Sequence, residues 1–178
     1  MSPPTTKAEI LAALESNQDA IVTYFSAQAE AVLFTGDPER WGPAHHLQHL
    51  AQTSQAIGRG LRKSELPLHP SGHSRGYGEL IGAATAALQA APRETLLERG
   101  RTVIVSPNTS RPELVETYRA ASADLRAAAA VWRDDELDRR ALPHPYLGAL
   151  TVREMLLFCV FHERHHLRSV RKRLETVA

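Results

Sequence analysis

The 178-residue chain has the length of one ordinary domain, and with 43% hydrophobic residues it can bury a core without disulfide support. Its formal net charge of +1 gives no overall argument for binding nucleic acid or an anionic membrane, and no apolar run approaches the about 18 residues of a membrane span. A single cysteine, Cys159, excludes an intrachain disulfide, and the N-terminus lacks a signal-peptide pattern, so we expect a cytoplasmic protein.

The first half of the chain predicts two long helices. Thr6 and Glu9 have the spacing of a capping box, and apolar residues recur at helical spacing over residues 7 to 33. The sequence TGDP at 35–38 breaks this pattern. A second helix is expected over about 43 to 62, where proline suits the first turn.

The middle of the chain carries weaker signals. Residues 63–76 form a loop rich in Pro, Gly and Ser. Helical spacing resumes at about 78, is interrupted at Pro92 and ends with a short piece at Gly100. The stretch RTVIV at 101–105 has strand-like composition, but no second strand is evident, so we expect an extended connection.

Two more long helices are predicted near the C-terminus. Ser110 and Glu113 repeat the capping-box spacing before a helix over about 111 to 132. A charged stretch and a turn at 143–148 then lead into a helix over 151 to 175. Four long helices with connections of variable length predict an all-α four-helix bundle with one or two long crossover connections.

The last helix is the one around which the others are expected to pack. Thr151 and Glu154 form its predicted capping box. Residues 155 to 161 are apolar without a break, more than one helix face needs, and they include Cys159, which we expect to be a small buried side chain. The same surplus of apolar residues predicts a homodimer built on helix faces.

Histidines supply the most specific chemical pattern. His162 and His166 are four residues apart, so both rings lie on one face of the last helix. Such a pair plus one histidine from the second helix would make a three-histidine site with open coordination positions, which is typical of a catalytic zinc, copper, nickel or iron ion. The alternative is a solvated or packed histidine pair, and spacing alone does not choose between His46 and His49 as the third ligand.

Three pieces, WGPAHHLQHLAQTS, HPYLGALTVREMLLF and HERHHLRSVRKRL, resemble the DinB-like superfamily, also called the DinB/YfiT-like putative metalloenzymes. The resemblance covers most of the chain, with little of it between residues 64 and 110. It implies that His49, His162 and His166 bind a divalent metal ion such as Zn, Ni or Fe. His165 then becomes a neighbour of the site, and either His45 or His46 is a candidate to contact a ligand ring without binding the metal itself.

The resemblance also implies that residues 1–178 form a single DinB-like helical bundle domain, often as a homodimer. Characterised relatives include transferases and isomerases that use low-molecular-weight thiols, so thiol-dependent transfer on a metal is the first expected activity. Hydrolysis by a metal hydroxide is the second. The non-enzymatic alternative is a bundle with a structural metal or a binding role. The family name does not imply a DNA polymerase.

Two other features carry less chemistry. The basic end of the last helix, from Arg164 to Arg173, is better read as a solvated face at a helix C-terminus than as a nucleic-acid site. Glu163 is considered as a general base, but it points about 100° away from His162 around the helix. No residue is therefore assigned a catalytic role beyond the metal ligands.

Overall fold

The computed structural model describes residues 3–36, 41–63 and 65–175, and it confirms the predicted all-α four-helix bundle with one small hairpin added. No helix in these ranges is both long enough and apolar enough to cross a membrane. In chain order the elements are α1 (Lys7–Ser26), α2 (Glu30–Leu33), α3 (Pro43–Leu61), α4 (Tyr77–Ala90), α5 (Arg93–Arg101), α6 (Arg111–Ala130), β1 (Ala141–His144), β2 (Gly148–Thr151) and α7 (Val152–Glu175).

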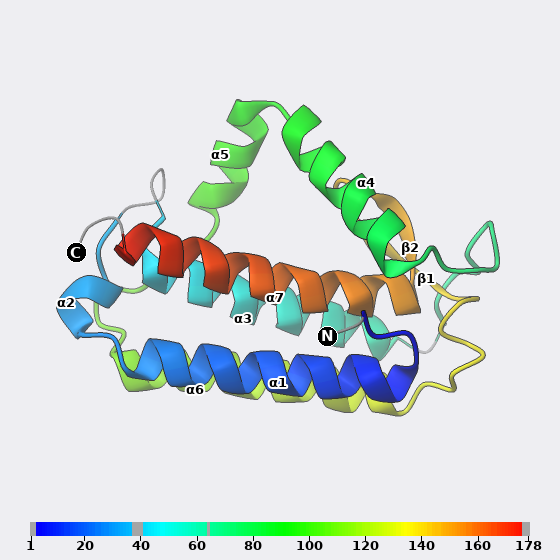
Figure 1. Ribbon diagram of the computed structural model, residues 1–178, viewed down its shortest axis with the longest axis horizontal. Helices are drawn as coiled ribbons and strands as arrows, with labels where there is room; N and C mark the ends of the chain where they lie inside the picture. Colours follow the sequence, from blue (N-terminus) through cyan, green and yellow to red (C-terminus); the bar gives the residue numbers. More distant parts are fainter. Residues whose placement is uncertain (1–2, 37–40, 64, 176–178) are drawn as a thin grey trace.

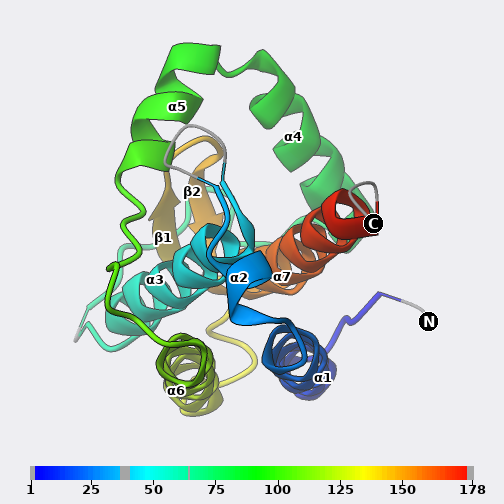
Figure 2. The ribbon, with the colours of Figure 1, turned by 90° about the vertical axis from the view of Figure 1, so that its left-hand side faces the viewer.

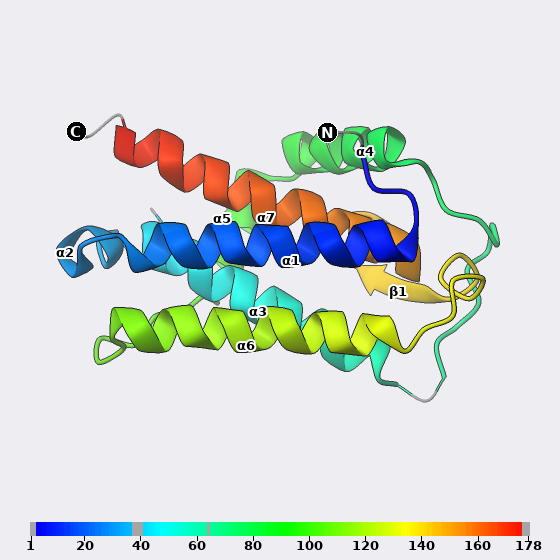
Figure 3. The ribbon, with the colours of Figure 1, turned by 60° about the horizontal axis from the view of Figure 1, so that its bottom comes forward.

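The bundle consists of α1, α3, α6 and α7 (Figure 1). Seen end-on, α1 and α6 form one layer, α3 and α7 the next, and α4 with α5 stands over the second layer as an arch (Figure 2). Helices α1 and α7 run in one direction and α3 and α6 in the other (Figure 3). The chain therefore crosses the length of the bundle once between α3 and α6, and this long crossover contains the arch.

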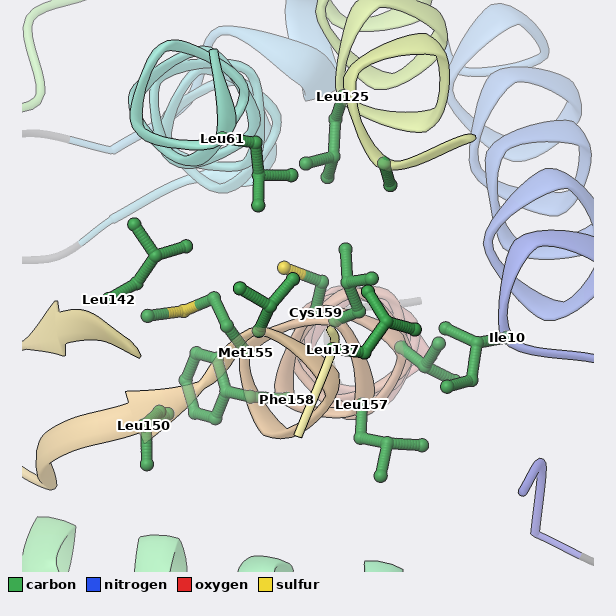
Figure 4. Packing of buried hydrophobic residues seen from close by; sticks show 14 of the residues in the cluster. Ile10, Leu61, Leu125, Leu137, Leu142, Leu150, Met155, Leu157, Phe158 and Cys159 are labelled. Carbon is green, nitrogen blue, oxygen red and sulfur yellow. The ribbon is translucent and has the colours of Figure 1, made fainter. Parts of the chain in front are cut away.

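Helix α7 lies at the centre, as its continuous apolar stretch predicts. It contacts α1, α3, α4 and both strands, and every side chain from Met155 to Val160 is buried (Figure 4). Cys159 is among them, and burial raises the pKa of its thiol, so it is the inert packing residue that the sequence indicates. Because one chain covers this apolar surplus, the surplus no longer argues for a dimer.

Helix starts are fixed locally by the predicted capping boxes, each of which is formed. In every case the hydroxyl accepts a hydrogen bond from the backbone N–H three residues on, and the glutamate accepts one from the cap residue's own N–H. The three pairs are Thr6 with Glu9, Ser110 with Glu113, and Thr151 with Glu154.

Helices α3 and α6 approach closely at Gly58, which has no side chain. Gly58 is buried against α6, where an added Cβ would lie 3.2 Å from Asp124 Oδ2 and 3.6 Å from Leu125 Cα. Arg62 reaches across the same contact to pair with Asp124 at 2.6 Å. This packing holds α3, and with it the histidines at its start, against the bundle.

The expected single helix over 7 to 33 is interrupted near its end and forms two helices. Helix α1 ends at Ser26, Ala29 is extended, and α2 turns back so that Leu33 is fully buried. The carbonyl of Gln28 freed by this break accepts a 2.6 Å hydrogen bond from Arg111 Nη1. A tertiary partner therefore replaces the lost helix bond. Residues 37–38 of the predicted break lie outside the described residues.

The expected turn at 143–148 joins two short strands that were not expected, in an antiparallel hairpin with Ala141 opposite Thr151 and His144 opposite Gly148. Gly148 has φ of 71°, a conformation that favours glycine at the end of the turn. Earlier in the chain, α5 continues past Gly100 to Arg101, one residue into the stretch expected to be extended. The two strands were not predicted because each has four residues, too few to show an alternating pattern, and one of them contains Pro143.

Candidate metal centre

Three histidine side chains from two helices converge at one point. His49 is supplied by α3, and His162 and His166 by α7. His162 Nε2 lies 3.1 Å from His49 Nε2 and 3.0 Å from His166 Nε2, and one nitrogen from each ring lies within 4.8 Å of the others. Two nitrogens bound at about 2.0–2.1 Å to one ion are themselves about 2.9–3.4 Å apart, so the spacing of these groups suits a divalent metal.

The nitrogen atoms of the three rings are crowded around His162 Nε2. A neutral imidazole nitrogen carries either one hydrogen or one lone pair, so it makes one good hydrogen bond in the ring plane. His162 Nε2 nevertheless has two nitrogen neighbours within 3.1 Å. A cation between the three rings would instead take one lone pair from each of the three nitrogens at once.

Two further side chains contact the converging histidine rings. His46 Nδ1 lies 2.7 Å from His166 Nδ1, so it contacts the ring nitrogen on the side opposite the cluster. The Trp41 ring lies 5.0 Å from the His49 ring and 5.4 Å from that of His46, and its Nε1 donates to the carbonyl of Gly100 at 3.2 Å. The tryptophan thus ties the end of α5 to the histidine cluster.

A cavity of about 990 Å³ opens beside the cluster. Helices α3 and α7 form one side of it, and the α4–α5 arch and the hairpin form the others. Its wall is mainly apolar, and it includes all three converging histidines. Such a volume is typical of a small-molecule site. The apolar side chains that line it are contributed by five elements and include Ile57, Leu88, Leu97, Leu147, Phe158 and Phe161.

The sequence model of the DinB superfamily matches residues 13–170. The chain belongs to the DinB superfamily. This match confirms the resemblance seen in the helix-opening tryptophan and the paired histidines. The crystal structure of TT2238, described as a four-helix bundle protein, is 20% identical, with a TM-score of 0.59 over 94% of this chain and 99% of that chain. At that identity the likeness shows the fold alone. No curated protein matches the chain.

In this DinB-superfamily chain, the environment keeps the clustered imidazoles neutral. Burial lowers the pKa of His49 to about 4, and burial together with the neighbouring histidines and Arg173 lowers the pKa of His46 to about 4. Burial also holds the pKa values of His162 and His166 well below the ordinary value of 6.5. Neutral imidazole is the form that binds metal, so the site is ready for a cation at neutral pH.

The remaining histidines lie elsewhere or play other parts. His165 is exposed at the edge of the cavity, 5.5 Å from the His166 ring. His45 is buried at the start of α3, where its Nδ1 accepts a 3.4 Å hydrogen bond from Gly42 N. His69 and His73 lie away from the cluster and bond to Ser71, whereas His144, the last residue of β1, lines the cavity.

His46 and His49 occupy different positions relative to the cluster, so single substitutions test which of them is the third metal ligand. His49→Ala is expected to lose bound metal, because it removes one of the three converging nitrogens. His46→Ala is expected to keep most of it, with affinity lowered about 10–100-fold, because it removes only the partner of His166 Nδ1. Metal titration of both variants is the measurement. Equal and complete loss of metal in both variants would contradict the assignment of His49, and not His46, as the ligand from α3.

Glu163 faces away from the histidines, as the 100° rotation predicts. It is 2% exposed in the bundle core, where its carboxylate accepts from Tyr118 Oη at 3.0 Å and Asn17 Nδ2 at 3.1 Å. Burial raises its pKa to about 7, and the two hydrogen bonds partly offset that rise. The residue therefore belongs to a buried polar network joining α1, α6 and α7, on the far side of α7 from the cavity.

Tyr118→Phe is expected to destabilise the protein by about 1–3 kcal/mol, because it removes one donor from the buried Glu163 carboxyl group. Urea unfolding measures the change. Tyr77→Phe is the matched control, since no hydrogen bond is seen for that hydroxyl within the described ranges. Equal stability of the two variants would show that the network contributes little.

Sequence reasoning missed several residues of the site. Trp41 opens the first of the three pieces that resemble the family, and its ring also contacts the cluster. Phe158 stacks on the His162 ring with centroids 5.2 Å apart, and His144 meets Phe158 edge-on at 4.5 Å. The apolar run of the last helix contained Phe158, but only the fold shows which of its residues faces the cavity.

Proposed function

We propose that the protein binds a divalent metal ion through His49, His162 and His166 and uses it in an enzymatic reaction on a small molecule. The observation that carries the proposal is the convergence of three imidazole nitrogens at the wall of a large apolar cavity. Zn, Ni and Fe all suit imidazole ligands. Held by three neutral ligands, such an ion would keep its charge uncompensated and would supply a nucleophile by acidifying a thiol or a water molecule.

The surroundings favour catalysis over a structural metal. Structural zinc sites are closed by four protein ligands, whereas the described residues bring three metal-binding groups together here, beside a cavity. A non-enzymatic bundle with a structural metal or a binding role is the alternative, and it predicts a fourth protein ligand or an enclosed ion. The cavity argues for a bound substrate instead.

The chain's own residues have definable roles in such a site. Trp41 and Phe158 pack against the ligand rings and exclude water from two sides. His144 accepts backbone hydrogen bonds from Tyr146 and Leu147 at Nδ1, each 3.2 Å long. In the neutral ring its proton is therefore on Nε2, which makes this cavity residue a hydrogen-bond donor.

Thiol-dependent transfer is the first activity to test, with hydrolysis second. Cobalt-loaded protein titrated with a low-molecular-weight thiol such as N-acetylcysteine is expected to develop a thiolate-to-cobalt absorption band. N-acetylserine, with a hydroxyl in place of the thiol, is the matched control and should leave the spectrum nearly unchanged. A cobalt spectrum that does not change when the thiol is added would remove the transferase proposal and leave hydrolysis.

The homodimer expected from the sequence stays a prediction.

A further inference from the structure

The cavity runs lengthwise along α3, and the histidine cluster lies at one end of it. The residues of α3 that line it recur at helical spacing, beginning with His49 and continuing through Thr53, Ala56 and Gly60. They form one stripe, so the cavity follows the helix from the histidine cluster toward its C-terminus. Arg59 is ten residues beyond His49 in this helix, which corresponds to about 15 Å along the axis.

The end of the cavity distant from the histidines is cationic. Arg59 and Lys63 both line it, and both side chains are exposed. Within the described residues neither side chain is paired with a carboxylate, and no aspartate or glutamate lines the cavity. A ligand that complements this end of the cavity therefore carries a negative charge.

Between the two ends the wall is apolar. Met155 and Phe158 of α7 face this stretch, with Ala84 and Leu88 of the arch and Leu142 of the hairpin. A mainly apolar wall with a few polar groups at defined points is typical of a site that orients an amphipathic ligand.

We infer that the cavity takes an elongated, mostly apolar molecule with a single anionic group, which Arg59 and Lys63 bind at the end distant from the histidines. The inference rests on the proposed function for one point, that the reacting end of the molecule lies at His49, His162 and His166. The apolar part of this molecule would contact the apolar wall of the cavity, and its anionic group would pair with Arg59 and Lys63.

Isothermal titration calorimetry with decanoate and its uncharged analogue decanol tests this on metal-free and zinc-loaded protein. Decanoate is expected to bind metal-free wild type about five- to tenfold more tightly than decanol, the size expected of two exposed ion pairs. The double variant Arg59→Gln, Lys63→Gln should lose this preference and bind decanol unchanged. Arg139→Gln, which removes an exposed cation that does not line the cavity, should behave as wild type.

Cations also favour a helix C-terminus, so binding and not stability is the measurement that decides. A preference for decanoate that survives in the double variant, or that appears only with zinc, would overturn the inference, because the anion would then be held elsewhere or by the metal. Absence of binding by either ligand would overturn it too. The expected pattern in a protein that takes up no zinc would keep the ligand class and remove the metal function.

Discussion

Chelator-stripped protein is expected to melt about 5–10 °C higher after Zn²⁺ or Ni²⁺ is added. His49 and His162 are 113 residues apart in sequence, and the unfolded chain does not hold them together. An ion that binds only the native state at about a hundredfold above its dissociation constant adds about 2.7 kcal/mol. For a chain of this size each kcal/mol raises the melting temperature by about 2–4 °C.

His162→Ala and His166→Ala should each abolish the shift, because either change leaves two of the three converging nitrogens. His69→Ala is the matched control, since this histidine lies in a loop away from the cluster, and it should respond to metal as wild type does. Differential scanning calorimetry with and without metal measures the shift. A wild type that melts at the same temperature in both conditions would leave the histidines as packing residues.

Metal-free protein is expected to lose stability as the pH falls from about 6.5 toward 4. Burial lowers the pKa of His46 and of His49 to about 4, so between these limits the unfolded chain binds protons that the native state does not. The stability these groups contribute is present above pH 6.5 and is lost as the pH falls. Each histidine lowers the free energy of unfolding by about 1.4 kcal/mol per pH unit, or about 3 kcal/mol at pH 4.

Glu163 acts in the opposite sense. Its pKa is raised from 4.5 to about 7, so its contribution is complete below pH 4.5 and is lost as the pH rises through 7. Urea unfolding between pH 5 and 7 separates the two effects: His49→Gln should make the acid loss shallower, and Glu163→Gln should make it steeper. Equal slopes in wild type and His49→Gln would contradict the lowered pKa of His49.

The same pKa values bear on metal binding. A free imidazole is half protonated near pH 6.5, but buried His49 remains neutral in the native state to well below pH 6. The melting shift produced by metal should therefore persist to about pH 5, lower than the ordinary value for histidine would suggest.

Local chemistry explains what could be predicted from the sequence. Capping boxes such as Thr151 with Glu154 use neighbouring residues alone, so helix starts were read correctly. The spacing of His162 and His166 placed both on one face of the last helix. The choice of His49 over His46 needed the resemblance to the DinB-like superfamily, because helical periodicity placed His46 near the edge of the apolar stripe and His49 further round and did not decide between them.

Long-range contacts explain what could not be predicted. The break before α2 depends on Arg111, far along the chain, which satisfies the carbonyl of Gln28. The arch of α4 and α5 has weak periodicity and shares little with the family motifs, yet it covers α7 and encloses the cavity. Arg59 and Lys63 line the cavity only because the arch encloses it, so no local sequence pattern predicts their role.

Anomalous diffraction at the zinc edge from crystals of zinc-loaded protein tests the central claim most directly. The account predicts one peak per chain, bounded by the Nε2 atoms of His49, His162 and His166, with its remaining coordination positions facing the cavity. A peak at other histidines, a fourth protein ligand that closes the site, or no peak at all would contradict it.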